Sequence, residues 1–360
     1  MMIVFWLLVL PSLALVWGLS PHTTQHHLAP RRNGSVLRGA CVVKETTAIE
    51  GQKPGTSGVR KRTAVWESSH PTYVENLMQS ILKGWELPEG FTVVLGGDGR
   101  YYSRRATEKI LGVLAANGCG RVLVPFGGVI ATPAASALIR KEKADGGVLL
   151  TASHNPGGKD GDFGIKFNTG PDGAPAKEDL TDRVYQATLD ITEVKTLAAV
   201  PREIMDAIFG GGTTNEATSF ELVSSAKTTT EVQVVDGCAA YLELLEECFD
   251  LEKIATELPS DFKVVIDAMH GAAGPAATRL LTKLLGEDRV EIRRGTPKAD
   301  FGGCHPDPNL KWASDLAATF GVPGGVPGGA TEGLPDFGAA LDGDGDRNMI
   351  LGRNRFVTPS

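Results

Sequence analysis

The sequence predicts an α/β protein in which one pattern of strands and helices occurs twice along the chain. Three observations support this: short apolar runs alternate with amphipathic stretches, hydrophobic residues make up 42% of the chain, and 44 glycines with 21 prolines punctuate it. At 360 residues the chain is long enough for about two or three domains. The formal net charge of -7 and the lack of a basic stripe argue against a nucleic-acid partner.

The first occurrence of the pattern contains three predicted strands and two predicted helices. We expect strands at residues 92–95, 121–125 and 147–150, separated by helices at 106–116 and 133–143. This β-α-β-α-β order implies a parallel sheet. Ser153 follows the third strand, at the sheet edge where open α/β sheets bind ligands.

A polar stretch around residues 210–230 predicts a linker, after which the alternation resumes. We expect helices at 239–249, 276–285 and 312–320, and strands at 263–266, 290–292, 337–341 and 349–351. Residues 321–333 contain two copies of Gly-Val-Pro-Gly-Gly and predict a flexible loop.

The first forty residues predict a targeting segment. Residues 3–17 are almost wholly apolar, like a signal-peptide core, and residues 21–40 are basic without any acidic residue, like a transit segment. The apolar run is short for a membrane span, which needs about 20 residues, so we expect no stable membrane span. We expect secretory-type or plastid targeting, with a cytoplasmic location as the alternative. The five cysteines form no C-x-x-C pair, which argues against a disulfide framework or a zinc site.

A glycine-rich turn holds a hydroxyl group at residues 151–158, Thr-Ala-Ser-His-Asn-Pro-Gly-Gly. Backbone N–H groups of such a turn can surround an anion, so a phosphate on Ser153 would be held there. A serine considered alone more often makes only a turn hydrogen bond. A Ser-His hydrolase is a poor fit, because the turn lacks G-x-S-x-G and His154 is the immediate sequence neighbour of Ser153.

A second loop holds three aspartates, Asp342, Asp344 and Asp346, directly after the strand at 337–341. Clustered carboxylates repel one another unless a hard divalent cation binds, and oxygen ligands favour magnesium, calcium or manganese. An EF-hand is excluded, because its glycine and glutamate positions hold Arg347 and Arg353. A phosphatase with an aspartyl nucleophile is the strongest rival, although the Gly-Asp-Arg continuation does not suit it. The serine loop and the acidic loop together indicate phosphoryl transfer.

Four ordered blocks resemble the α-D-phosphohexomutases: residues 53–62, residues 151–158 continued at 161–168, residues 300–303 with 305–309, and residues 342–352. The resemblance covers roughly residues 52–360 and implies repeated mixed-sheet α/β domains, two present and a third only begun. Family members have four domains, so we expect an N-terminal part. The implied divisions are a targeting segment at 1–40, domain I at 41–225, domain II at 226–352 and the start of domain III at 353–360.

The resemblance also implies an activity. TASHNPGG followed by GDFGIKFN resembles the glucose-preferring branch, which interconverts glucose 1-phosphate and glucose 6-phosphate through a phosphoserine and glucose 1,6-bisphosphate. It implies Mg²⁺ as cofactor and small hexose phosphates as partners. A non-catalytic phosphohexomutase-like protein that binds ligands or other proteins is the alternative.

Site residues follow from the same blocks. The resemblance implies that Ser153 is the phosphoserine and, with Asp342, Asp344 and Asp346, a magnesium ligand. His154 and Lys166 are candidates for proton transfer and substrate contact. The residues expected to bind substrate or phosphate are Thr56, Ser57, Arg60, Arg62 and Arg347, with Arg60 also in the catalytic group. Without the blocks, an ordinary solvated basic face would explain Arg60, Arg62 and Lys166. Cys304 departs from the family pattern, which usually has histidine there.

Overall fold

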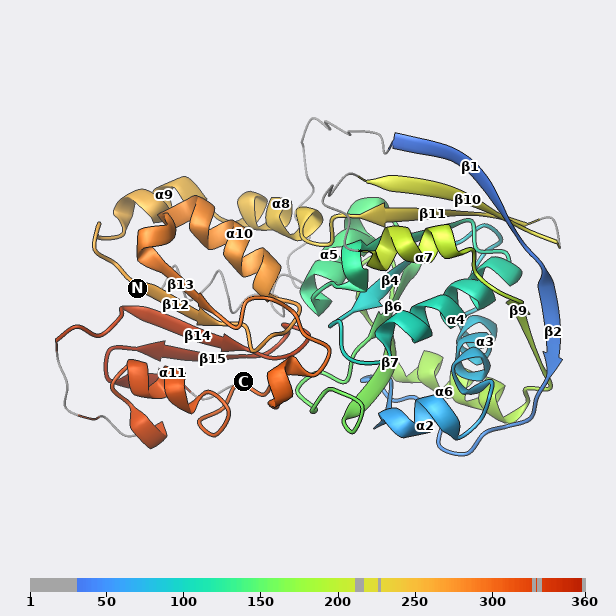
Figure 1. Ribbon diagram of the computed structural model, residues 1–360, viewed down its shortest axis with the longest axis horizontal. Helices are drawn as coiled ribbons and strands as arrows, with labels where there is room; N and C mark the ends of the chain where they lie inside the picture. Colours follow the sequence, from blue (N-terminus) through green and yellow to red (C-terminus); the bar gives the residue numbers. More distant parts are fainter. Residues whose placement is uncertain (1–30, 211–216, 226–227, 326–327, 329–331, 358–360) are drawn as a thin grey trace.

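The computed structural model describes residues 31–210, 217–225, 228–325, 328 and 332–357 of the chain. These residues form two α/β lobes that lie side by side, the larger one from the N-terminal part of the sequence (Figure 1). Within this described part, no helix is long and apolar enough to cross a membrane. The apolar run at residues 3–17 lies outside the described residues.

A nine-stranded mixed sheet forms the centre of the larger lobe, in the order β1-β10-β11-β5-β4-β6-β7-β3 with β8 beside β7. The central strands β5, β4 and β6 are parallel, and β6 pairs with β7 in antiparallel fashion. The strands are β1 (Arg31–Gly39), β3 (Val59–Arg62), β4 (Thr92–Gly97), β5 (Arg121–Pro125), β6 (Gly146–Leu150), β7 (Asp162–Thr169), β8 (Ala174–Pro175), β10 (Thr218–Ser224) and β11 (Thr229–Val235). A separate two-stranded sheet pairs β2 (Cys41–Glu45) with β9 (Glu193–Leu197).

Helices cover both faces of the large sheet because successive strand residues point to opposite sides. In β4, for example, Val93 and Leu95 pack into one apolar cluster while Val94 packs into another. The first cluster joins the sheet to α3 and α4, and the second joins it to α5 and the start of α8. The helices of this lobe are α2 (Thr63–Ser68), α3 (Tyr73–Trp85), α4 (Ser103–Ala116), α5 (Thr132–Glu142), α6 (Glu178–Leu189) and α7 (Arg202–Phe209), with a 3-10 turn, η1 (Phe126–Gly128).

The smaller lobe has a five-stranded mixed sheet in the order β13-β12-β14-β15-β16. One of its faces packs on α9 and α10, and the other packs on α11. Its strands are β12 (Val264–Asp267), β13 (Val290–Arg293), β14 (Phe337–Leu341), β15 (Asn348–Gly352) and β16 (Arg355–Val357). Its helices are α8 (Ala239–Cys248), α9 (Leu251–Glu257), α10 (Gly274–Leu285) and α11 (Ser314–Thr319), with 3-10 turns η2 (Glu287–Arg289), η3 (Phe301–Gly303) and η4 (Pro323–Gly325).

The structure confirms the α/β class and each strand and helix that the alternation predicted, to within a few residues at the ends. The linker expected around residues 210–230 was wrong in its described part. There β10 and β11 form an antiparallel hairpin, and β11 also pairs in parallel with β5. The large sheet therefore extends past the boundary expected between residues 225 and 226. Threonine, glutamate and glutamine at less buried positions, and serine at buried ones, hid the alternating apolar pattern of these strands.

Two expectations at the chain ends also change. Residues 31–39, which we expected in a targeting segment, form β1 at the edge of the large sheet, paired in parallel with β10. Residues 355–357, which we expected to open a third domain, form β16 and pair with β15 of the second sheet. In the expected loop at 321–333, Val322 is buried and residues 323–325 form a 3-10 turn. Residues 326–327 and 329–331 of that loop lie outside the described residues.

Backbone hydrogen bonds connect the two lobes beside the ends of β4, β6 and β14. Thr132 N donates to Asp344 O at 2.8 Å, and the amides of Tyr101 and Gly158 both donate to Ala299 O, at 2.8 and 3.1 Å. These contacts bring the serine loop of one lobe against the acidic loop of the other.

Candidate active site

Ser153 lies in a tight turn that follows β6. Its side chain is 1% exposed, and its φ of 53° places it in the left-handed region that non-glycine residues seldom adopt. Its amide donates to Thr151 Oγ1 at 2.7 Å, and its Oγ donates to Asp342 Oδ2 at 2.8 Å. The hydroxyl is therefore directed toward the acidic loop.

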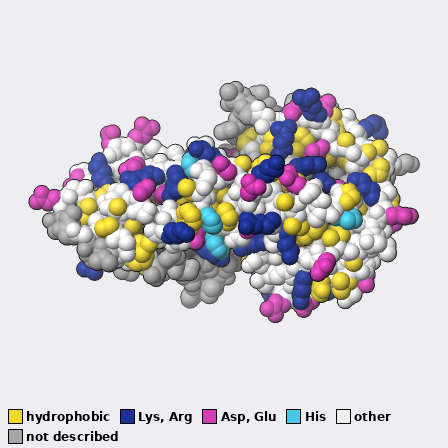
Figure 2. All heavy atoms as spheres, turned by 60° about the horizontal axis from the view of Figure 1, so that its bottom comes forward, with side chains coloured by type: hydrophobic (Ala, Val, Ile, Leu, Met, Phe, Trp, Pro, Cys, Tyr) yellow, Lys and Arg dark blue, Asp and Glu magenta, His cyan; other side chains and the backbone are white. Residues whose placement is uncertain are grey.

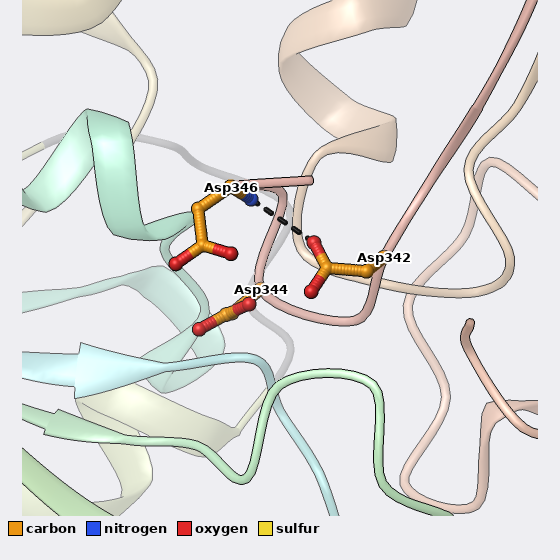
Figure 3. Close-up of side chains that lie close together, drawn as sticks. All are labelled: Asp342, Asp344 and Asp346. Carbon is orange, nitrogen blue, oxygen red and sulfur yellow. Dashed lines mark hydrogen bonds between the residues drawn. The ribbon is translucent and has the colours of Figure 1, made fainter. Parts of the chain in front are cut away.

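Asp342, Asp344 and Asp346 follow β14 and turn their carboxylates toward one another (Figure 3). One oxygen from each lies within 4.8 Å of the others. The loop closes on itself because the amides of Asp346 and Arg347 both donate to Asp342 Oδ1, each at 3.0 Å. Asp342 and Asp344 are buried, so this turn holds two carboxylates away from water.

Burial and mutual repulsion govern the protonation of this cluster. Burial, reinforced by the charges of Asp344 and Asp346, raises the pKa of Asp342 well above its ordinary value. Burial and the charge of Asp344 also raise the pKa of Asp346. Burial alone would raise the pKa of Asp344, but the charge of Lys166, together with hydrogen bonds from Asp342, Thr132 and Lys166, outweighs burial and holds that pKa below the usual range. Lys166 Nζ lies 3.2 Å from Asp344 Oδ2 and 3.5 Å from Asp346 Oδ2. The two carboxylates raise the pKa of Lys166 in spite of its burial, so its ammonium group stays charged.

The residues present fit a divalent cation. Asp344 Oδ1 is buried and makes no hydrogen bond, although a buried carboxylate oxygen ordinarily has a partner. One lysine does not balance three carboxylates, and the raised pKa values of Asp342 and Asp346 reflect that imbalance. Oxygen donors of this kind suit a hard cation.

Basic side chains border the serine hydroxyl. Arg347 Nη1 donates to His154 Nδ1 at 2.7 Å, and His154 Nδ1 lies 3.5 Å from Ser153 Oγ. Burial and the nearby Arg347 lower the pKa of His154, which favours the neutral imidazole that accepts this hydrogen bond. Arg60 is half-buried on β3, opposite Gly164 of β7, and its Nε has no hydrogen-bond partner. Its charge lowers the pKa of both His154 and Lys166, which places it close to the same group.

Three expected binding residues lie outside this cluster. Thr56 and Ser57 are exposed on a turn whose Gly58 packs against the backbone of Lys166. Arg62 is exposed; it donates to Asp160 O at 2.9 Å and lies 3.7 Å from Asp162. The structure therefore brings together Ser153, His154, Lys166, Arg347 and the three aspartates with Arg60 nearby, and leaves Thr56, Ser57 and Arg62 on the adjoining surface.

Residues outside the predicted site support the two loops. Thr132, the first residue of α5, donates its hydroxyl to Asp344 Oδ2 at 3.0 Å. Asp98 and Arg100, at the end of β4, form a buried ion pair against the serine loop. A Thr-Pro pair opening a helix and a polar Asp-Gly-Arg run after an apolar strand were the available signals.

On the face shown in Figure 2, lysine, arginine and histidine side chains lie around the junction of the lobes, interspersed with acidic side chains.

Each lobe matches a domain of one known protein family. Residues 51–195 match the phosphoglucomutase/phosphomannomutase α/β/α domain I, and residues 239–355 match α/β/α domain II, so the chain belongs to this family. This confirms the resemblance of the four blocks.

Individual relatives agree. The chain is 46% identical over 316 residues to a phosphoglucomutase of Rhizobium radiobacter, covering 88% of this chain and 53% of that protein. It is 44% identical over 324 residues to human phosphoglucomutase-1, covering 89% and 54%. The crystal structure of parafusin, a phosphoglucomutase from Paramecium, superposes with a TM-score of 0.78 at 41% identity, covering 91% and 57%. The chain thus spans about half the length of the relatives it matches.

Proposed function

We propose that this chain carries the phosphoserine and the metal site of a phosphoglucomutase. The reaction interconverts glucose 1-phosphate and glucose 6-phosphate through glucose 1,6-bisphosphate. The observation that carries the proposal is the 2.8 Å hydrogen bond from Ser153 Oγ to Asp342 Oδ2, which joins the nucleophile of one lobe to the acidic loop of the other. The names of the relatives, phosphoglucomutases at 44–46% identity, support glucose phosphates as the substrates.

In the transfer step, a hydroxyl oxygen of the bound sugar phosphate forms a bond to the phosphorus on Ser153. The bond from phosphorus to Ser153 Oγ breaks, and the hydroxyl proton leaves the attacking oxygen. The departing Ser153 Oγ takes up a proton in exchange. Neutral His154, 3.5 Å from Ser153 Oγ, is our candidate for accepting the proton of the attacking hydroxyl, and the buried, charged Lys166 is our candidate for donating a proton to the departing oxygen and contacting the substrate. Arg60 and Arg347 place positive charge where the phosphoryl oxygens accumulate negative charge.

Asp342, Asp344 and Asp346, with an oxygen of phosphorylated Ser153, would hold the metal. Mg²⁺ is our choice among the hard cations. When bound, it supplies positive charge that neutralises the transferring phosphoryl group. The unpartnered Asp344 Oδ1 supports this assignment.

Labelling with radioactive glucose 1,6-bisphosphate tests the proposal. We expect one phosphoryl group per chain on wild type, and none on Ser153→Ala. Ser68→Ala is the matched control, because Ser68 is exposed on α2 and donates only to Ala64 O. Equal labelling of Ser153→Ala and wild type would refute the assignment. Complete absence of labelling in wild type would favour the non-catalytic binding role.

We also propose that the N-terminal residues direct the protein to a plastid or the secretory pathway. The support is the apolar and basic composition of residues 1–40. N-terminal sequencing of the protein from its native cells tests this. A mature chain that begins near residue 30 supports targeting, and one that begins at Met1 or Met2 supports the cytoplasmic alternative.

A further inference from the structure

The ion pair between Asp98 and Arg100 lies beneath the serine loop and takes no part in the chemistry proposed above. Both side chains are 0% exposed, and Arg100 Nη2 lies 2.8 Å from Asp98 Oδ2. Arg100 Nε adds contacts to Asp98 Oδ1 and Oδ2 at 3.0 and 2.9 Å. A pair buried this deeply is weak evidence for stability, because desolvation offsets much of its attraction. Its other contacts indicate what it does.

The pair holds both polar backbone groups of Ser153. Arg100 Nη2 donates to Ser153 O at 2.8 Å. On the other side, Thr151 Oγ1 donates to Asp98 Oδ2 at 2.7 Å and accepts the Ser153 amide at 2.7 Å. The left-handed backbone of Ser153 is thus fixed at its N–H and at its C=O by one buried unit.

The same guanidinium makes three further contacts, one of them a hydrogen bond from Nη1 to Asn155 O at 3.4 Å. Arg100 Nη1 donates to Asp162 O at 2.8 Å, at the start of β7, so it also fixes where the turn ends. Its planar face lies 5.1 Å from the centre of the Phe301 ring, which belongs to the second lobe and is fully buried. The planar, forked shape of arginine is needed to satisfy these acceptors together, and lysine cannot reproduce it.

We propose that Asp98, Arg100 and Thr151 are positioning residues that set the direction of Ser153 Oγ for phosphoryl transfer. This inference rests on the proposed function of Ser153. With both backbone groups held, the only freedom left to the serine is rotation of its side chain, and Oγ points to Asp342. Loss of the hydrogen bonds to the Ser153 backbone would displace Oγ. A displacement of about 1 Å can reduce a transfer rate about 100-fold.

The test measures the single-turnover rate of Ser153 phosphorylation by glucose 1,6-bisphosphate, together with the Kd for that compound. Thr151→Val keeps the side-chain shape and removes only the hydroxyl that joins Asp98 to the Ser153 amide. We expect the rate to fall about 10- to 100-fold while the Kd changes less than about threefold. Thr230→Val is the matched control, because Thr230 is equally buried and its hydroxyl donates to Cys119 O at 2.7 Å, away from the loop.

A second pair of variants keeps the test decisive if one protein folds poorly. Arg100→Lys retains the charge and should keep more activity than Arg100→Met, and both should lose rate rather than affinity. Wild-type rates in Thr151→Val, or an equal loss in Thr230→Val, would overturn the inference. If wild type itself is not labelled on Ser153, the proposed function fails instead, so the two failures are distinct.

Discussion

Asp344 shows most directly what the charges of the site demand. It is 1% exposed, its Oδ2 accepts from Lys166 and Thr132, and its Oδ1 has no partner. A carboxylate oxygen left unpaired in the interior costs about 1–3 kcal/mol unless a ligand satisfies it. The geometry of Asp344 therefore suits a site in which a bound ligand contacts its Oδ1.

The first prediction removes that charge. Asp344→Asn should abolish stabilisation by Mg²⁺, because the altered group is neutral and one ligand oxygen is lost. Binding to the native state stabilises wild type by about 2.7 kcal/mol at a metal concentration 100 times the Kd. Thermal unfolding with and without Mg²⁺ measures the difference. Asp261→Asn, at an exposed aspartate, is the control and should respond like wild type. A full Mg²⁺ response from Asp344→Asn would contradict the assignment.

The second prediction concerns pH and the buried thiol of Cys119. Burial raises its pKa from an ordinary 9.0 to about 12. Above pH 9 the thiol ionises in the unfolded chain but not in the folded one, so the free energy of unfolding falls as pH rises from 9 to 12. At pH 10 the Cys119 thiol lowers the free energy of unfolding by about 1.4 kcal/mol.

Between pH 7 and pH 10, the free energy of unfolding of Cys119→Ala should therefore fall by about 1.4 kcal/mol less than that of wild type. Urea unfolding of both proteins at the two pH values measures this, and contributions from all other groups cancel in the comparison. An identical loss in the two proteins would show that Cys119 ionises in the folded state.

At the residue scale, sequence patterns identified the groups that we propose carry the chemistry and missed the residues that hold them in place. Ser153 and the three aspartates were identifiable, because glycine-rich and acidic turns after apolar strands are unusual. Asp98, Arg100 and Thr132 are ordinary residue types whose importance depends on contacts across 50 or more positions of sequence. Arg62 carried a motif signal, yet it bonds to the nearby backbone instead.

At the scale of elements, close approach of strands β4 and β6 sets where the serine loop begins. Gly97 ends β4, and a Cβ atom there would lie 2.0 Å from Leu150 O at the end of β6. Only a glycine lets the two strand ends approach closely enough for Asp98 N to donate to Leu150 O at 3.1 Å. The strand pair therefore places Asp98 next to Thr151.

Gly97→Ala should consequently destabilise the fold by about 1–3 kcal/mol, because the methyl group must displace backbone. It should also slow labelling of Ser153. Gly55→Ala serves as the stability control, since nothing lies within 4 Å of a Cβ at that position. Equilibrium unfolding in urea compares the two. Equal stabilities would mean that the strands separate without penalty.

Strand identity was predictable where apolar residues dominated and failed where they did not. Strand β5 matched its predicted bounds because its buried residues are valine, leucine and a terminal proline. In β10 and β11 the buried positions alternate with threonine, glutamate and glutamine, and the surrounding polar residues resembled a linker. Pairing with β5, a contact distant in sequence, is what makes β11 part of the large sheet.

At the scale of the whole molecule, the site exists because two lobes meet. Gly157 of the serine loop packs against Phe301, where a Cβ would lie 2.7 Å from the ring, and Gly343 of the acidic loop lies against Ser153 O and the same ring. The sequence predicted two α/β units, a serine loop and an acidic loop. The resemblance of the four blocks to the phosphohexomutases implied that the two loops share one site. The packing at this junction depends on side-chain shapes that no periodic pattern records.

The fourth prediction tests that junction. Phe301→Ala removes a fully buried ring from between the lobes and should cost about 3–5 kcal/mol of stability. It should also slow labelling of Ser153 under conditions where the protein stays folded, because Arg100 loses its packing partner. Phe320→Ala is the control, since Phe320 is equally buried but lies in the core beneath α11. If labelling of Ser153 slowed equally in Phe301→Ala and Phe320→Ala, lower stability alone would explain the slower labelling.

The most direct test of the whole account is the chemical identity of the phosphorylated residue. The protein is incubated with radioactive glucose 1,6-bisphosphate, digested and mapped, with and without hydroxylamine, which cleaves aspartyl phosphates and leaves phosphoserine intact. We predict a hydroxylamine-stable label on the peptide that contains Ser153. A hydroxylamine-labile label on Asp342 or Asp344 would contradict the account and establish the aspartyl-nucleophile chemistry that the acidic loop alone would permit.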